Sequence, residues 1–107
     1  MKTPNKLHGL LGMAKRAGRL CVGFDATATA IKDGSARLVL LAADASPKTE
    51  KECRFLAEAK HIAVSRISFD KNEIAAALGA HKPVAVVSVN DEGFAKAIDS
   101  MKEDDRL

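Results

Sequence analysis

The apolar residues along the chain follow two different spacings. Near the N-terminus they recur at the spacing of one helix face, at Leu7, Leu10, Leu11 and Ala14. At 38–43 they instead form an unbroken run, and at 84–89 a second run interrupted only by Ser88. Helical spacing returns after each of these runs, so the pattern predicts alternating helices and strands.

Five helices and four strands are expected in a single domain spanning 1–107. We predict helices at 4–17, 24–33, from 47 onward, at 70–78 and from 91 onward, and strands at 19–22, 38–43, 62–67 and 84–89. Unbroken apolar runs are typical of strands buried on both faces. We therefore expect an α/β fold, a three-layer α/β/α sandwich around a mixed, largely parallel sheet of about four strands.

Capping residues predict where several helices begin and end. Helix starts are predicted at Thr3-Pro4, Ser46-Pro47, Asp70, and Asn90 or Asp91. Helix ends are predicted at Gly18 and Gly34. Asp25, Asp44 and Asp91 are interpreted as capping residues because none has a paired base. Gly9 and Gly12 lie inside the first helix and indicate close packing against a neighbour.

Composition changes this picture little. The chain has 107 residues, of which 47% are apolar and 29% charged, as in an ordinary soluble globular domain. No apolar run approaches the roughly 18 residues of a membrane helix, and the N-terminus has no signal-peptide core. Cys21 and Cys53 stand far apart without a CxxC pair, which favours a reducing compartment. We expect a cytoplasmic protein with no membrane partner, no metal and no cofactor.

Charge is distributed unevenly. Residues 1–24 carry five basic side chains and no acid, residues 25–98 are balanced, and the last nine residues are net acidic. The basic side chains of the first segment stand just before a helix that is bracketed by Gly23 and Gly34. A helix N-terminus beside positive charge favours phosphate binding, so this stretch is the candidate working surface and a polyanion the expected partner.

Catalytic motifs are absent from the sequence. There is no nucleophile elbow, P-loop or dinucleotide-binding glycine turn, and His8, His61 and His81 stand in three separate segments. His81 differs from the other two because it lies in a loop beside Lys82 and Pro83, where a partner can reach it. The sequence therefore favours binding over catalysis.

Aromatic residues are few. The chain has no Trp, no Tyr and four Phe, and Phe55, Phe69 and Phe94 are predicted at core or boundary positions. That leaves no aromatic platform for stacking single-stranded bases. If nucleic acid binds, structured RNA held by helix ends, loops and basic side chains is the expected form.

The stretch from Gly23 to Ser46, with Ala30-Ile31-Lys32-Asp33-Gly34 leading into the apolar run and Asp44-Ala45-Ser46, resembles the ribosomal protein L7Ae family of kink-turn RNA-binding proteins. Within it, the small bacterial YlxQ-like branch is the nearest likeness. Supporting segments are LLGMAKRAG at 10–18, Gly79 before the second buried strand, and DEGFAK at 91–96. The likeness covers about residues 5–98.

The resemblance implies an α/β/α RNA-binding module, associated with the ribosome or acting on another structured RNA. In kink-turn-binding members the second helix starts with an Asn-Glu pair and has a Lys one turn later. By position the pair falls on Asp25 and Ala26, and the Lys on Thr29. Asp accepts hydrogen bonds from guanine but repels phosphate. The resemblance thus implies RNA binding with altered reading residues, and the loop that covers flipped-out bases falls on 80–83.

Our hypothesis is a non-enzymatic, ribosome-associated RNA-binding protein, monomeric when free. The predicted RNA-binding residues are Lys15, Arg16, Arg19, Gly23, Phe24, Asp25, Thr29, Lys32, Asp44, Ser46, His81, Lys82 and Pro83. About four phosphate contacts, chiefly from the basic cluster, predict a log–log salt slope of roughly −3 to −4. The alternatives are a protein-interaction module on the same fold and a small hydrolase or nucleotide-binding enzyme.

Overall fold

The computed structural model describes residues 5–105, and side-chain surroundings from 6 to 100. Thr3 and Pro4, the predicted start of the first helix, lie outside the described residues. The elements in chain order are α1 (Asn5–Arg16), β1 (Leu20–Val22), α2 (Phe24–Lys32), β2 (Leu38–Leu41), α3 (Pro47–Ala59), β3 (Ala63–Arg66), α4 (Lys71–Leu78), β4 (Val86–Val89) and α5 (Glu92–Asp105). The alternation predicted from the apolar pattern is confirmed.

The four strands form one mixed sheet in the order β1-β4-β2-β3. The strands predicted from the two apolar runs, β2 and β4, occupy its centre, and every residue of both is buried, including Ser88 of β4. The expectation of a largely parallel sheet was wrong. Only β2 and β3 pair in parallel, whereas β1 and β2 both run antiparallel to β4. The last strand of the chain, β4, lies in the centre of the sheet and runs antiparallel to both of its neighbours. No local sequence pattern specifies this direction.

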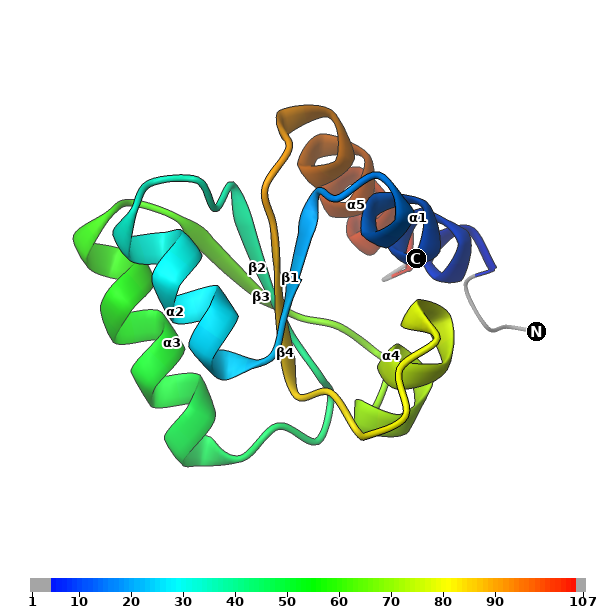
Figure 1. The fold of residues 1–107 in the computed structure, drawn as a ribbon, viewed down its shortest axis with the longest axis horizontal. Coiled ribbons are helices and arrows are strands. Elements are labelled where there is room, and N and C mark those ends of the chain that lie inside the picture. The colour runs from blue at the N-terminus through cyan, green and yellow to red at the C-terminus, as the bar shows by residue number, and fades with distance from the viewer. Residues whose placement is uncertain (1–4, 106–107) are drawn as a thin grey trace.

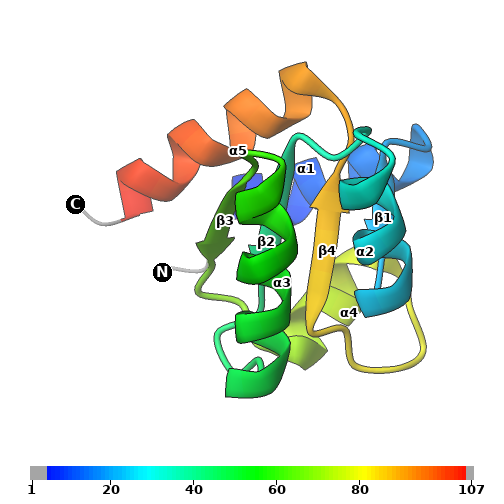
Figure 2. The ribbon, with the colours of Figure 1, turned by 90° about the vertical axis from the view of Figure 1, so that its left-hand side faces the viewer.

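Helices cover both faces of the sheet, which gives the predicted three layers. Helices α2 and α3 pack together on one face, and α1 contacts both α4 and α5 on the other (Figure 1). A quarter turn shows α3 and α2 side by side in front of the strands (Figure 2). No helix of residues 5–105 is long and apolar enough to span a bilayer.

Core packing explains one of the two glycines in α1. A Cβ at Gly12 would lie 3.3 Å from the Ala77 carbonyl oxygen, so α1 and α4 approach closely there. A Cβ at Gly9 would meet nothing within 4 Å, so the prediction of close packing was right for Gly12 and wrong for Gly9. Phe69 is buried and Phe94 is half-buried, as predicted.

Most predicted helix ends are confirmed. The Ser46 hydroxyl accepts a hydrogen bond from the Thr49 N–H at 3.1 Å, and Asp70 and Glu73 form a reciprocal capping box at the start of α4. The Asp91 carboxylate accepts from the Phe94 N–H at 2.9 Å, which resolves the choice between Asn90 and Asp91.

The two ends of the sheet differ in the segments that meet there. At one end β1 and β2 finish and β4 begins, so Gly23, the loop 42–46 and the loop 79–85 meet there; we call this the site end. The Gly23 N–H donates to Val86 O, and the Ala42 N–H donates to Ala85 O, each at 2.9 Å. At the opposite end β1 and β2 begin and β4 finishes, because β4 is antiparallel to both.

Candidate nucleic-acid interface

The first turn of α2 lies at the site end, where its backbone N–H groups are unpaired donors. Gly23 is the N-cap residue, with φ 92°, and no side chain caps this helix. A positive φ favours glycine because a Cβ is strained there. The first N–H groups of a helix lack partners within it and carry partial positive charge. This end of α2 therefore presents donors for an acceptor from outside the chain.

Asp25 does not cap α2, which corrects its interpretation as a capping residue. It lies in the first turn, after the Gly23 N-cap, and its side chain is exposed. A carboxylate there is favourable for the helix dipole but adds negative charge beside the unpaired N–H groups. Asp25 thus places exposed hydrogen-bond acceptors beside the backbone donors of α2.

A hollow of about 580 Å³ adjoins the start of α2. One wall is Val22, Gly23 and Phe24, and the other is the loop from Ala80 to Ala85, including His81, Lys82 and Pro83. The loop leaves α4 through Gly79, a left-handed residue with φ 70°. The structure therefore brings together five of the predicted site residues, from segments almost 60 positions apart in the chain.

The loop 42–46 forms the next part of the site end, and its two predicted site residues have structural partners. Asp44 accepts a hydrogen bond from the Lys71 N–H at 2.9 Å and so holds the start of α4. This supports the capping interpretation of Asp44, with the difference that the helix belongs to a distant segment. Ser46 caps α3 with its hydroxyl oxygen, as described above.

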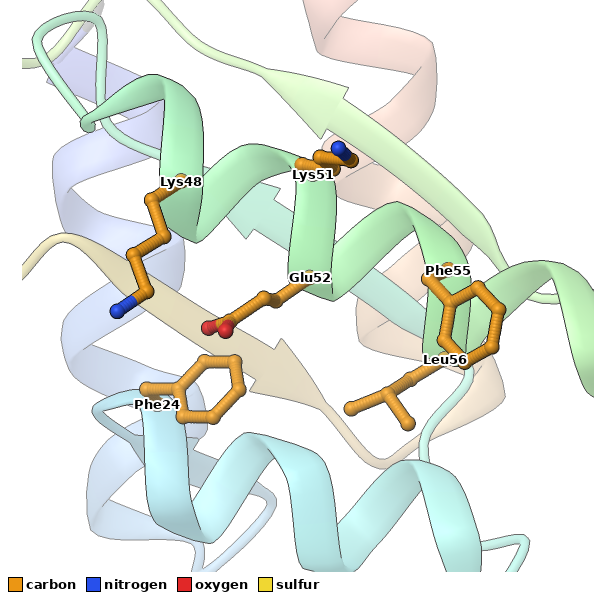
Figure 3. Close-up of a pocket in the computed structure, with 6 residues that line it drawn as sticks. All are labelled: Phe24, Lys48, Lys51, Glu52, Phe55 and Leu56. Atoms are coloured by element: carbon orange, nitrogen blue, oxygen red, sulfur yellow. The ribbon is translucent and has the colours of Figure 1, made fainter.

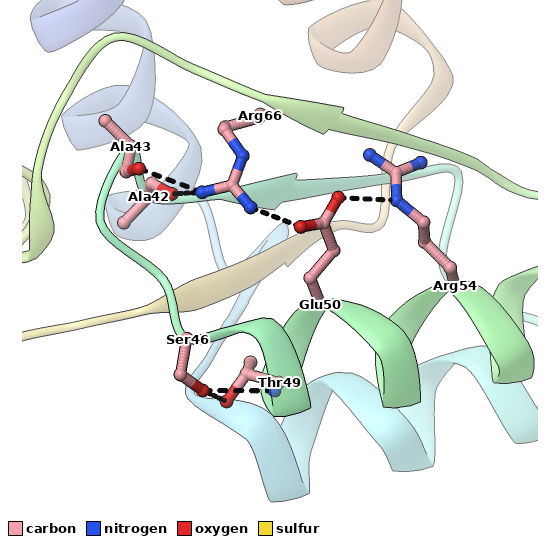
Figure 4. Close-up of polar contacts among 7 residues, drawn as sticks. All are labelled: Ala42, Ala43, Ser46, Thr49, Glu50, Arg54 and Arg66. Carbon is pink, nitrogen blue, oxygen red and sulfur yellow. Dashed lines mark hydrogen bonds and ion pairs between the residues drawn. The ribbon is translucent and has the colours of Figure 1, made fainter.

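Arg66 fixes this loop from the neighbouring strand (Figure 4). Its guanidinium donates to Ala42 O at 3.1 Å and to Ala43 O at 2.8 Å, and it pairs with the Glu50 carboxylate. Glu50 also accepts from Arg54 Nε at 2.8 Å. Hydrogen bonds from Arg54 and then Arg66 hold the pKa of Glu50 below its ordinary value. The loop at the site end is thus rigidly supported.

The predicted basic cluster lies elsewhere. The Asn90 N–H donates to Arg19 O, and β4 finishes just before Asn90, so Arg19 stands at the opposite end of the sheet. Four residues of extended chain separate it from Gly23, a distance of about 13 Å. Lys15 and Arg16 form the last turn of α1, just before Arg19. Charge that is adjacent in sequence is therefore not adjacent in space to the start of α2.

Two further predicted RNA-binding residues lie farther along α2, away from the hollow. Thr29 and Lys32 are exposed, and Lys32 ends the helix. At 1.5 Å per residue, Lys32 lies about 12 Å along the axis from Phe24. Neither residue lines the hollow.

The sequence interpretation missed an exposed aromatic residue. Phe55 is 74% exposed on α3, not at a core or boundary position. It stands two residues after the buried Cys53, which rotates it about 200° from the buried stripe. The helical spacing alone could have predicted this exposure. Phe55 belongs to a second hollow between α2 and α3, of about 520 Å³, which also includes Phe24 (Figure 3).

Other chemistry is limited in the described part of the chain. Burial raises the pKa of the Cys53 thiol, so this residue is a small core side chain rather than a nucleophile. Among the described residues no three His, Cys, Asp or Glu side chains are grouped to hold a metal ion. The site end offers backbone donors, a loop lysine and exposed apolar surface, which are means of binding.

This geometry defines a class of protein, an α/β/α domain whose sheet is covered by helices on both faces and whose helix starts and loops meet at one end of the sheet. The chain belongs to the ribosomal protein L7Ae/L30e/S12e/Gadd45 family, whose model matches residues 5–99. The resemblance seen in the sequence is therefore confirmed, and so is the fold that it implied.

Individual relatives agree with this assignment. The chain is 34% identical to the RNA-binding protein YlxQ of Enterococcus faecium, over 85% of each chain. It is 26% identical to the large ribosomal subunit protein eL30 of Spodoptera frugiperda, over 95% of this chain and 90% of that one. The solved structure of a Bacillus halodurans protein of unknown function superposes with a TM-score of 0.84 at 30% identity, covering 92% of this chain and 97% of that one.

Proposed function

We propose that this chain is a non-enzymatic RNA-binding protein that holds structured RNA, ribosomal RNA in the first place, at the site end of its sheet. The observation that carries the proposal is the hollow in which the uncapped start of α2 faces the loop 80–85. Family membership supports it, since the YlxQ and eL30 relatives are named as RNA-binding and ribosomal proteins.

The chemistry of the hollow suits RNA better than a small substrate. Unpaired N–H groups at the start of α2 can donate hydrogen bonds to a phosphate oxygen. Lys82 adds a positive charge on the facing loop, and Phe24 and Pro83 offer apolar surface for a base. Asp25 can accept from guanine N–H groups, in place of the residues that read kink-turns in other family members.

The direct test is binding of the intact protein to fragments of ribosomal RNA, measured by filter binding over a range of salt concentrations. We expect salt-dependent binding, and Lys82→Ala should reduce the log–log salt slope by about 1 because it removes one phosphate contact. The matched control is Lys60→Ala, an exposed lysine at the C-terminal end of α3. Absence of binding, or affinity independent of salt, would contradict the proposal.

The interaction-module alternative makes a different prediction for the same variants. A protein partner that recognises the apolar surface of the hollow should be insensitive to Lys82→Ala and to added ribosomal RNA. Pull-down of the partner with and without RNase treatment separates the two functions. Loss of the partner after RNase treatment supports RNA binding.

A further inference from the structure

The groove between α2 and α3 is an apolar hollow bordered by charge, on a face that core packing leaves open. Phe24 faces it from the first turn of α2, while Lys48, Glu52 and Leu56 extend toward Phe24 from α3 (Figure 3). Phe55 stands beside Leu56 at the far end of the row. Its ring is largely exposed although α3 has a well-buried inner face.

Lys48, Lys51 and Phe55 share one side of α3, since they are spaced by three and four residues. None of the three makes an ion pair or side-chain hydrogen bond within the described residues. A flat exposed ring next to free cations is the combination that binds unpaired nucleotides, through base stacking and phosphate attraction. Glu52, on the inner side, can accept from the amino or imino groups of a base.

The groove between α2 and α3 adjoins the site end, which favours the same RNA as its ligand. Phe24 lines both this groove and the hollow at the start of α2, so the two form one path along the surface. RNA held at the site end would pass its neighbouring nucleotides into the groove. The groove volume of about 520 Å³ fits a small ligand such as one nucleotide, whereas a stable protein interface needs about 20–30 residues on each side.

We propose that the α2–α3 groove binds an unpaired nucleotide of the same RNA, with its base on the Phe55 ring and its phosphate near Lys48 and Lys51. This inference rests on the proposed RNA-binding function and adds to it a second contact with a different chemistry. It also supplies an aromatic ring for base stacking, which was not predicted from the sequence.

The test compares two synthetic RNA hairpins with the same stem, one with a bulge of unpaired uridines and one fully paired, by fluorescence anisotropy with the full chain. Phe55→Ala should weaken binding of the bulged hairpin about 5- to 100-fold, the loss that removal of one base–aromatic stack produces. Binding of the paired hairpin should change less than twofold. Because Phe55 is exposed, the variant should keep the thermal stability of the wild type.

Phe55→Leu is the informative companion variant because it keeps apolar surface and removes the flat ring. It should bind the bulged hairpin as weakly as Phe55→Ala. Wild-type affinity of Phe55→Leu, or equal affinity of Phe55→Ala and the wild type for the bulged hairpin, would overturn the groove proposal. A Phe55-dependent dimer in sedimentation, without an effect on RNA, would also overturn it by assigning the groove to a second copy.

The outcome for the wild type separates the two proposals. If the wild type binds neither these hairpins nor ribosomal RNA fragments, the RNA-binding function itself fails. If it binds RNA and responds to Lys82→Ala but not to the Phe55 variants, only the groove proposal fails. Lys51→Ala should reduce the salt slope for the bulged hairpin by about 1, with Lys60→Ala as the control.

Discussion

The two ends of the sheet differ in what they present, although β1 carries the chain from one to the other within four residues. The site end offers an uncapped helix start, two hollows and exposed apolar surface around Phe24. The opposite end offers charge: Lys15 and Arg16 in the last turn of α1, Arg19 just before β1, and the Arg37–Glu92 pair, whose charged atoms lie 3.8 Å apart. The site end therefore offers hollows and oriented N–H donors for direct contact, whereas the opposite end offers mainly charged side chains.

The difference shows that groups able to contact an RNA directly and charges able to attract it from a distance can lie at different ends of one small domain. Hydrogen bonds and stacking act only over contact distances, so they belong to the site end. Charges at the opposite end act over about 10 Å at moderate salt, which is shorter than the 13 Å or so to Gly23. We expect the basic cluster to speed the approach of RNA and the site end to hold it. The variants below test this separation.

The largest effect should come from paired glycine variants, one at each end. Gly18 and Gly23 both have positive φ, and a Cβ at either would meet nothing within 4 Å. Both Gly→Ala changes should lower the free energy of unfolding through backbone strain, as measured by urea denaturation, Gly18→Ala by about 1–2 kcal/mol. Gly23→Ala should cost about 1–3 kcal/mol, because φ 92° with ψ 167° is a conformation that essentially only glycine adopts. Only Gly23→Ala should weaken RNA binding, about tenfold or more, because it displaces the N–H donors of α2. Equal losses of RNA affinity in Gly18→Ala and Gly23→Ala would contradict the proposed difference between the two ends of the sheet.

A smaller effect is expected from the double variant Lys15→Ala with Arg16→Ala. At low salt it should weaken RNA binding two- to fivefold through a slower association rate, and above about 0.15 M salt the difference should vanish. The salt slope should therefore become shallower only below about 0.15 M salt, whereas Lys82→Ala should lower it over the whole range. Stopped-flow association measurements provide the check. A decrease of about 2 in the slope would place phosphates directly on the cluster and would restore the original hypothesis.

Two hydroxyl groups of the α2 region give an effect on stability alone. Thr27 is fully buried in α2 near the site end, and its Oγ1 has no hydrogen-bond partner among the described residues. Thr27→Val should raise the free energy of unfolding by about 1 kcal/mol, because a buried, unpaired hydroxyl is costly. Toward the opposite end, the Ser35 hydroxyl donates to Ala30 O, so Ser35→Ala should be neutral or slightly destabilising. Urea denaturation measures both, and a destabilised Thr27→Val would contradict the burial argument.

The smallest effect concerns acid sensitivity at the two ends. Glu50 supports the loop at the site end, and Asp33 accepts hydrogen bonds from Ser35 near the opposite end; both have a lowered pKa. A lowered pKa in the folded state adds stability above the unfolded-state pKa, and this stability is lost as pH falls through the folded-state value. Glu50→Gln and Asp33→Asn should therefore reduce Tm slightly at pH 7. The loss should fade as pH falls through each folded-state pKa, which lies below 4.5 for Glu50 and below 3.8 for Asp33.

RNA binding distinguishes this last pair of variants. Glu50→Gln should weaken RNA binding modestly because the loop 42–46 loses part of its support, whereas Asp33→Asn should leave binding unchanged. Filter binding at pH 7 gives both values. Equal affinities for the two variants would show that the loop needs no support from Glu50.

The elements of the fold could be read from local patterns, because periodicity and capping act within a few residues. Ser46, Asp70 and Asp91 cap the helices that their sequence context indicates. Strand direction could not be read, because the partner of each strand is set by distant segments. The largely parallel expectation failed for that reason at β4.

The candidate site shows the same division between local and distant information. Gly23 and the loop around Lys82 were found from the sequence as separate pieces, but only the fold shows that they share a hollow. The basic cluster was misplaced relative to them because β1 carries the chain across the sheet between Arg19 and Gly23. Phe55 was missed although its spacing from Cys53 indicated exposure. The Arg66 contact with Glu50 joins positions far apart in sequence and has no local signal.

Phe24 has one ring but borders two hollows, so the two cannot change independently. A substitution there alters the wall of both at once, and a nucleotide settling on one side restricts the rotamers of the ring for the other. In a double-mutant cycle, changes at Phe24 and Phe55 should therefore depart from additivity, whereas changes at Phe55 and Lys15 should simply add. A single half-buried side chain thus couples the two proposed binding surfaces.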